Sequence, residues 1–430
     1  MSSSISRRTF FQGATMAAAA TRVMGANDRI RIGIVGLGGR GGAHLGNYMA
    51  IPDAQVTGLC DVNQAARETF QARLTRSGAP KAGEYNDMRK LFESKDIDAV
   101  SIATPNHWHA LATIWAIEAG KDVYVEKPAS HNIYEGNRMI EMARKHKKMV
   151  QVGSQSRTTP HKMRAIQMLK EGIIGEVYMA RALCFKRRKS IGKTPPKPVP
   201  PGIDWDLFLG PAPMREFTDN RYKYNWHWFW DTGNGDIGNQ GVHEMDIARW
   251  GLGDIAWPET VESTGGKMIY DDDQETPNTQ VATFRCKGGK MVVFEVRGLP
   301  SGPEAGLPVT GGNTVGNIFL GSEGWMWLDS DILQVYKGEK SEKVLEVKES
   351  LGADAKLHME NFLKGCRSRN YKDLTAEIEI GALSAAWCHM ANISYRVGKS
   401  LAWDEAKGAF KNAPDANKLL TRDYRKPYVV

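Results

Sequence analysis

Lys127 is the residue whose setting most clearly indicates chemistry. It lies in Glu126-Lys127-Pro128, directly after an apolar, β-branched run at residues 122–125. The amine of a lysine can exchange a proton with a hydroxyl group or donate a hydrogen bond to its oxygen. Thr104-Pro105-Asn106 likewise follows the apolar run 99–103. Because open α/β sheets bind ligands at the carboxyl ends of parallel strands, we expect both segments to face one site.

A glycine-rich loop, Gly36-Leu37-Gly38-Gly39-Arg40-Gly41, follows the first apolar run, residues 30–35. In this pattern the first glycine turns the chain, the second lets the backbone approach a pyrophosphate, and the third lets the next helix pack closely on the strand. The N-terminus of that helix then faces the phosphate groups. The loop therefore predicts a dinucleotide site.

Asp61 directly follows the second apolar run, residues 56–60. A carboxylate at this place accepts hydrogen bonds from the hydroxyls of the adenosine ribose and repels a 2′-phosphate. We therefore expect the cofactor to be NAD. Arg40 is placed to contact a phosphate, which keeps NADP open as an alternative.

The elements that position these residues alternate in type up to about residue 153. Apolar runs at 30–35, 56–60, 99–103, 122–125 and 149–152 are separated by helical patterns at 64–77, 107–119 and 132–146. This alternation predicts βαβ units that form a doubly wound parallel Rossmann sheet. Beyond it, strands joined by tight turns and helices at 161–171, 236–251, 355–368 and 375–397 predict an α+β domain. Its large open sheet should be mainly antiparallel.

The glycine loop, Thr104-Pro105-Asn106 and Glu126-Lys127-Pro128 together resemble, in order and spacing, the Gfo/Idh/MocA oxidoreductases, the family of glucose-fructose oxidoreductase and inositol dehydrogenase. The resemblance implies hydride transfer between a carbon of a sugar, polyol or glycoside and C4 of nicotinamide, with Lys127 near the reacting hydroxyl. The cofactor site that we expect consists of Gly36, Gly38, Arg40, Gly41, Asp61, Thr104, Asn106, Glu126 and Lys127.

In this family a helix carrying Asp-x-Gly-x-His supplies the second half of the site. The matching segment here is Asn239-Gln240-Gly241-Val242-His243, so asparagine stands where the family has aspartate. An asparagine positions a hydroxyl by hydrogen bonding but cannot accept a proton. Proton transfer is therefore expected from Lys127 or His243, with Asn239 completing the catalytic set, or else Asp236 takes part.

Substrate contacts are expected from two places. Gln155 and Arg157 follow the sixth strand, where the family tends to place residues that face the substrate. An aromatic block at residues 222–230, which includes Trp228 and Trp230, precedes the site helix. Its rings could stack on a sugar, pack a long loop, or bury a subunit contact. The family resemblance also implies a homo-oligomer formed through the outer face of the C-terminal sheet.

No metal is expected. His107 and His109 lie two residues apart in a turn, and no Cys or carboxylate cluster follows at ligand spacing. The five cysteines are an odd number and widely spaced, without a Cys-x-x-Cys pair, so we expect them to be small buried side chains.

The net charge of +8, from 57 basic and 49 acidic residues, does not indicate a nucleic-acid partner. Three of the arginines lie in the first 26 residues, which contain no acid, and no basic run elsewhere is longer than Lys186-Arg187-Arg188-Lys189. No apolar stretch approaches the roughly 20 residues of a spanning helix, so we do not expect a membrane-embedded protein.

Residues 1–26 resemble a twin-arginine export signal. Ser6-Arg7-Arg8-Thr9-Phe10-Phe11 precedes an Ala-rich stretch at residues 13–20. The alternative is a disordered basic tail. We expect the export machinery as a partner, a periplasmic or otherwise exported location, and a cofactor bound before export. The expected division is thus a signal at 1–26, a dinucleotide-binding domain at 27–153 and a substrate-binding and oligomerisation domain at 154–430.

Three other functions stay open. An exported branch of the same family resembles glycoside hydrolases that oxidise a sugar transiently with bound NAD and then eliminate the aglycone. That branch lacks the lysine of Glu-Lys-Pro, so Lys127 favours plain oxidation. A glycoside 3-dehydrogenase lies between the two, and a non-enzymatic sugar- or cofactor-binding protein is supported only by Asn239.

Overall fold

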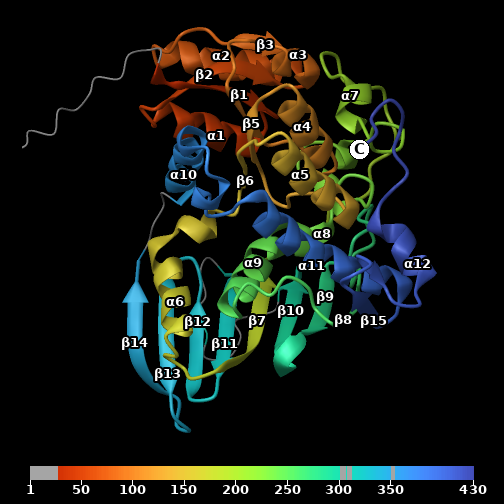
Figure 1. Cartoon of the computed structure of the whole chain (residues 1–430). Helices are drawn as coiled ribbons and strands as arrows, with labels where there is room; N and C mark the ends of the chain where they lie inside the picture. Colours follow the sequence, from red (N-terminus) through yellow and green to blue (C-terminus); the bar gives the residue numbers. More distant parts are fainter. Residues whose placement is uncertain (1–27, 301–306, 308–311, 350–353) are drawn as a thin grey trace, which may run out of the picture.

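The computed structural model describes residues 28–300, 307, 312–349 and 354–430; the expected export signal lies outside them. Figure 1 shows two sheets with helices between them. No helix in the described ranges is long and apolar enough to cross a membrane.

The first sheet has the predicted Rossmann topology. Its six strands are all parallel and lie in the order β3-β2-β1-β4-β5-β6, so the direction of winding reverses between β1 and β4. The strands are β1 (Ile30–Val35), β2 (Ala54–Cys60), β3 (Gly83–Tyr85), β4 (Ala99–Ile102), β5 (Asp122–Val125) and β6 (Val150–Val152). The helices are α1 (Gly39–Met49), α2 (Gln64–Arg76), α3 (Met88–Phe92), α4 (Asn106–Glu118) and α5 (Ile133–Lys145).

The second sheet is the predicted large, mainly antiparallel one. Its order is β14-β13-β12-β11-β7-β10-β9-β8-β15-β16, and only the β7/β10 pair is parallel. The strands are β7 (Val177–Phe185), β8 (Thr260–Gly266), β9 (Thr279–Arg285), β10 (Met291–Arg297), β11 (Thr314–Gly321), β12 (Gly324–Leu328), β13 (Ile332–Lys337), β14 (Glu342–Lys348), β15 (Leu401–Asp404) and β16 (Ala409–Phe410). The helices are α6 (Pro160–Lys170), α7 (Trp205–Leu209), α8 (Gly235–Asn239), α9 (Gly241–Gly251), α10 (Asp354–Ser368), α11 (Ile378–Val397) and α12 (Pro414–Asn417).

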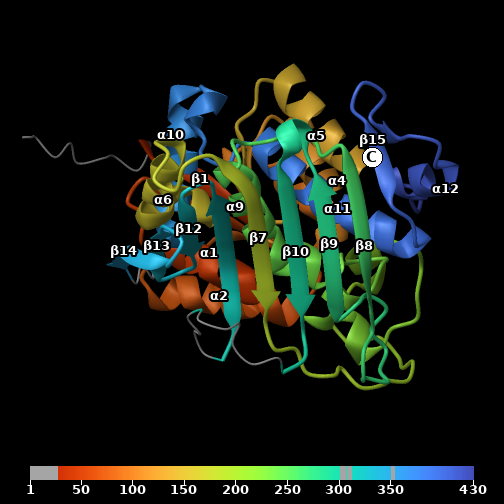
Figure 2. The ribbon, with the colours of Figure 1, turned by 90° about the horizontal axis from the view of Figure 1, so that it is seen from below.

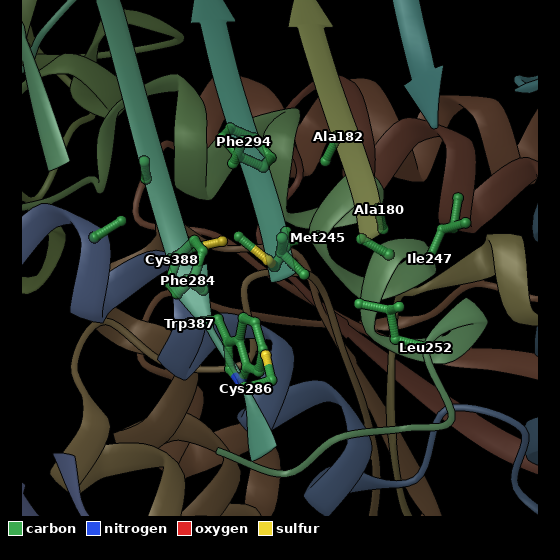
Figure 3. Close-up of a cluster of buried hydrophobic side chains, with 14 of the residues drawn as sticks. Ala180, Ala182, Met245, Ile247, Leu252, Phe284, Cys286, Phe294, Trp387 and Cys388 are labelled. Carbon is green, nitrogen blue, oxygen red and sulfur yellow. The ribbon is translucent and has the colours of Figure 1, made fainter. Parts of the chain in front are cut away.

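Helices α9 and α11 fill the space between the two sheets. Their apolar residues, such as Met245 and Trp387, pack against Phe284 of β9 and Phe294 of β10 in one buried cluster (Figure 3). The other face of this sheet carries no helix among the described elements, as the view onto strands β7, β10, β9 and β8 shows (Figure 2). The site helices α8 and α9 are therefore anchored on the sheet and lie on its Rossmann side.

The chain also returns to the Rossmann domain near its end. Met359, Phe362 and Leu363 of α10 share a core with Ile32 and Ile34 of β1. Helix α10 lies beside α1 in Figure 1. The last third of the chain therefore helps to hold the two sheets together.

The helix expected at 236–251 is divided, which corrects the prediction. Helix α8 ends at Asn239 and α9 begins at Gly241, although Gln240 itself keeps helical dihedral angles. Gly238 and Gly241 flank the break, and glycine weakens a helix. A Cβ on Gly241 would lie 2.4 Å from the ring of Phe294, so the close packing on β10 requires glycine there.

Candidate active site

The glycine loop has the shape that a dinucleotide requires. Gly36 has φ +88°, and a Cβ on it would lie 2.7 Å from the Ala103 carbonyl group, where the loops after β1 and β4 meet. A Cβ on Gly41 would lie 2.0 Å from the Gly36 carbonyl oxygen. Nothing lies within 4 Å of a Cβ built on Gly38, which leaves its backbone open to a phosphate at the start of α1.

Asp61, at the end of β2, binds the backbone of the glycine loop. One carboxylate oxygen accepts a hydrogen bond from the Leu37 N–H (2.6 Å) and the other from the Asn63 N–H (2.8 Å). Burial raises the pKa of Asp61, against the effect of these two donors. Its predicted contact with a ribose stays a prediction.

Thr104 and Asn106 lie at the end of β4 as expected, with different surroundings. The Thr104 hydroxyl is buried and has no hydrogen-bond partner among the described residues, which leaves it for a bound group. Asn106 Nδ2 instead donates to Asn234 Oδ1 at 3.0 Å, just before α8. Asn106 thus joins the cofactor side of the site to the helix that carries Asn239.

Glu126 is a buried acceptor for three side chains. Its Oε1 accepts hydrogen bonds from Arg40 Nε (2.7 Å) and Gln155 Nε2 (3.2 Å), and lies 3.0 Å from His44 Nε2. Burial alone would raise the pKa of Glu126, but the Arg40 charge and the His44 hydrogen bond hold it well below its ordinary range. Arg40, which we expected at a phosphate, therefore pairs with Glu126 in this structure.

Lys127 reaches across to α8. Its Nζ donates to the Asn239 backbone carbonyl at 2.9 Å and to Asn239 Oδ1 at 3.3 Å. Burial lowers the pKa of Lys127 to about 8, although the Glu126 carboxylate opposes this shift. The structure therefore brings the two predicted residues together and gives Lys127 a pKa suited to exchanging a proton near neutral pH.

Asp236 is not positioned as a free proton acceptor. Its two carboxylate oxygens are held by Arg188 through a forked contact, Nη2 to Oδ1 at 2.7 Å and Nε to Oδ2 at 2.8 Å. A bidentate pair of this kind fixes the carboxylate in one orientation, toward the arginine. The alternative in which Asp236 takes part in proton transfer loses support, and its evident task is to anchor Arg188.

His243 lies near Lys127, one turn beyond Asn239. Burial and the Lys127 charge hold the pKa of His243 well below its ordinary value, so the imidazole is neutral. No hydrogen bond of this ring to another described residue is present. It therefore remains available to a ligand, and its catalytic role stays a prediction.

The predicted substrate residues fall into two groups. Gln155 lies at the site, where Nε2 donates to the Tyr124 hydroxyl (2.9 Å) and to Glu126. Arg157 is buried in an ion pair with Asp246 of α9, at 2.8 and 3.0 Å, and also contacts Asp254. Its guanidinium is thus used to hold α9, and the structure gives no support to its contact with substrate.

The aromatic block mostly packs the loop. Trp228 is buried, with the Arg188 guanidinium 5.3 Å from its ring centroid, and Trp230 lies under Arg396 of α11 at 5.0 Å. Burial thus closes Trp228 to sugar stacking, and Arg396 lies over the ring of Trp230. Tyr224 is 51% exposed, and its hydroxyl contacts both Asn239 and Arg188.

The side chains of His107 and His109 contact backbone carbonyl groups. His109 lies with Nδ1 2.7 Å from the Pro128 carbonyl and Nε2 2.8 Å from the Thr104 carbonyl, and both nitrogens of His107 also face carbonyl groups. Within the described ranges no group of three or more His, Cys, Asp or Glu side chains could hold a metal ion. The five cysteines are buried and free.

Two contributors to the site were missed. Lys186 and Arg188 follow β7 as alternate residues of an extended segment, and such residues project to the same side. Lys186 Nζ donates to Gln240 Oε1 at 2.8 Å, and Arg188 binds Asp236. Their sequence signal is the basic run 186–189, which bears above only on a nucleic-acid partner.

Fold and site together define a two-domain, dinucleotide-binding protein with a lysine at the junction of its domains. Residues 30–154 match the oxidoreductase family with the NAD-binding Rossmann fold, and residues 170–290 and 323–430 match the C-terminal alpha/beta domain of that same family. The chain belongs to the Gfo/Idh/MocA oxidoreductases, as the sequence motifs predicted, and carries their NAD-binding domain.

Curated relatives carry one recurring name. A glycosyl hydrolase family 109 protein of Saccharopolyspora erythraea is 25% identical over 266 residues, which cover 60% of this chain and 50% of the relative. A protein of the same name from Shewanella baltica is 28% identical over 159 residues, which cover 36% of this chain and 35% of the relative. The chain thus spans about half, or about a third, of the length of these relatives.

Solved structures share the fold. The WlbA dehydrogenase from Bordetella pertussis, in complex with NADH and UDP-GlcNAcA, aligns with a TM-score of 0.64 at 20% identity over 87% of this chain and 99% of that one. A levoglucosan dehydrogenase, in complex with NADH and levoglucosan, aligns with a TM-score of 0.66 at 20% identity over the same shares. At these identities the likeness concerns the fold.

Proposed function

We propose that the protein is an NAD-dependent oxidoreductase that oxidises a hydroxyl-bearing carbon of a sugar, polyol or glycoside. The observation that carries this proposal is Lys127, whose amine has a pKa of about 8 and is held by Asn239 between the glycine-loop domain and α8. Two similar folds were solved with NADH and a sugar compound, which supports the substrate class.

Bound NAD supplies the hydride acceptor at nicotinamide C4. The chain's own residues handle the proton: the neutral amine of Lys127 accepts it from the substrate hydroxyl. Asn239 orients that amine, and the neutral His243 offers a second hydrogen-bonding group next to it. Glu126 stays charged and accepts hydrogen bonds from Arg40 and Gln155, which places both side chains next to the backbone of Lys127.

A panel of sugars, polyols and glycosides tests the proposal. Each compound is mixed with the purified protein and NAD, and NADH is followed by absorbance. We expect at least one pyranose or cyclic polyol to yield NADH, with NADP less effective because of Asp61. Mass spectrometry of the denatured protein should also release NAD or NADH if the cofactor is tightly retained. A panel without any reduction of either nucleotide contradicts the proposal.

The names of the curated relatives favour one second candidate, a glycoside hydrolase that oxidises and restores the sugar. In that case a nitrophenyl glycoside should release nitrophenol without net NADH formation. The presence of Lys127 makes net oxidation our first choice. Nitrophenol release at a rate exceeding any NADH formation would reverse that choice.

We further propose export by the twin-arginine route, supported by Arg7 and Arg8 ahead of the Ala-rich stretch. Residues 1–26 fused to a reporter should direct it out of the cytoplasm, and a double Arg7→Lys, Arg8→Lys change should retain it there. Export of the double variant contradicts the proposal. We also propose a homo-oligomer through the helix-free sheet face, to be tested by light scattering.

A further inference from the structure

Asn239 connects Lys127 to Tyr224 through a single amide. Lys127 Nζ donates to Asn239 Oδ1 at 3.3 Å, while Asn239 Nδ2 donates to the Tyr224 hydroxyl at 3.2 Å and to Asp236 Oδ1 at 3.4 Å. An ammonium group only donates hydrogen bonds and a carboxylate only accepts them. The two charged neighbours therefore fix which end of the amide faces which residue.

The Tyr224 hydroxyl oxygen accepts from two donors. One is Asn239 Nδ2, and the other is Arg188 Nη1 at 3.0 Å. Neither donor group can accept a hydrogen bond, so the phenolic hydrogen must point to a third partner. No described residue accepts it, and the side chain is 51% exposed, so the phenolic hydrogen is open to a ligand.

Other contacts hold Arg188, one of the two donors, and the Tyr224 ring in place. Arg188 is held by the forked pair with Asp236, and its guanidinium lies 5.3 Å from the centroid of Trp228 and 6.0 Å from that of Tyr224. The Tyr224 ring is also 4.5 Å from the ring of His227. The direction of the phenolic hydrogen is therefore set before a ligand arrives, which is the condition for selective recognition.

We propose that Tyr224 donates this hydrogen bond to the hydroxyl adjacent to the one that Lys127 deprotonates, and that the enzyme thereby selects a vicinal diol. Lys127 and Tyr224 lie at opposite ends of the Asn239 amide, so they address two neighbouring oxygens rather than one. This inference rests on the proposed oxidation. The reacting hydroxyl loses its proton to Lys127, its carbon loses hydride to nicotinamide C4, a carbonyl group forms, and Tyr224 keeps its proton.

The inference gives Asn239 a reason to differ from aspartate. A carboxylate at residue 239 would accept the phenolic hydrogen and turn it away from the substrate. The asparagine amide can only donate toward Tyr224 while it accepts from Lys127, so the hydrogen stays directed outward. Asn239 is accordingly a positioning residue, and Tyr224 is the group that contacts the substrate.

Monodeoxy sugars provide the test. Among methyl glucoside, galactoside and mannoside, the one with the highest kcat/KM is compared with its monodeoxy analogues in the wild type and in Tyr224→Phe. We expect the wild type to be about 10- to 100-fold less active on one analogue that lacks a hydroxyl next to the oxidised carbon, since the site leaves a polar group unpaired there. Tyr224→Phe should lose about 10-fold on the parent sugar and treat parent and that analogue alike.

Two further variants separate recognition from a loss of structure. Asn239→Asp retains the tyrosine and should also lose the discrimination. Tyr336→Phe removes a hydroxyl that donates to Gln334 in β13, remote from Lys127, and should leave kcat/KM and the discrimination unchanged.

The outcomes are distinguishable. If Tyr224→Phe lowers activity on the parent and on every analogue by the same factor, or if the wild type does not discriminate, the inference is wrong although the oxidation stands. If the wild type forms no NADH from any of these sugars or from the wider panel, the proposed function fails and the inference fails with it.

Discussion

Lys127 lies between two arginine–carboxylate pairs that are built differently. On the cofactor side, Arg40 contacts Glu126 through one nitrogen and one oxygen, at 2.7 Å, and the arginine side chain is 41% exposed. On the substrate side, Arg188 binds both oxygens of Asp236, and its side chain is only 16% exposed. A forked, covered pair has a fixed geometry, whereas a single contact leaves the half-exposed arginine more freedom to turn.

The difference in geometry between the two pairs matches the ligand that each side of the site binds. If Arg40 turns toward a phosphate, Glu126 still has the hydrogen bonds of His44 and Gln155. Arg188 has less freedom, because it binds both oxygens of Asp236, and the other described side chain that donates to this buried carboxylate is Asn239, at 3.4 Å. The cofactor side can therefore adapt, and the substrate side holds α8 and Tyr224 in one arrangement.

The largest expected effect is the loss of turnover when Lys127, which lies between the two pairs, is replaced and both pairs stay in place. Lys127→Met should lower kcat by about 10²- to 10⁴-fold, because the proton acceptor is lost. The affinity for NAD should change little, which calorimetric titration checks. Near-normal turnover in this variant would show that Lys127 is not the proton acceptor.

Breaking the substrate-side pair should cost the most stability. Arg188→Met leaves Asp236 buried without its partner, and we expect the free energy of unfolding in urea to fall by about 3–5 kcal/mol. Arg188→Lys keeps the charge but loses the fork, so it should recover only part of this stability. A loss below about 1 kcal/mol in Arg188→Met would remove the distinction between the two pairs.

The same contrast explains what could be predicted from sequence. The glycine loop and the ends of β1 and β5 depend on local patterns, and the structure has them where the motifs indicate. The Arg188–Asp236 and Arg40–Glu126 pairs join residues 48 and 86 positions apart, so no local pattern reveals them. The three-residue strand β3 and the break at Gln240 also escaped prediction, because one is very short and the other depends on packing against Phe294.

Breaking the cofactor-side pair should affect stability less, and cofactor affinity more, than breaking the substrate-side pair. Arg40→Met should lower the free energy of unfolding by less than Arg188→Met does, because Glu126, although it is also buried, keeps its contacts with His44 and Gln155. If Arg40 turns to a phosphate, the variant should bind NAD about 10-fold more weakly, as expected for a lost charged hydrogen bond. Unchanged affinity for both NAD and NADP would mean that Arg40 serves Glu126 alone.

The smallest effect is a shift in the pH profile. Lys127 must be neutral to accept a proton, so kcat/KM should rise with pH through its pKa of about 8. The Glu126 carboxylate favours the charged lysine, and Glu126→Gln removes that effect, so the pKa of Lys127 falls. The rise of kcat/KM should therefore move to lower pH, by about one unit. Asp236→Asn removes a carboxylate that raises the Lys127 pKa less, so it should shift the profile less in the same direction. Profiles between about pH 6 and 10 measure both variants, and a rise displaced to higher pH in Glu126→Gln would show that the proton acceptor is not a lysine beside this carboxylate.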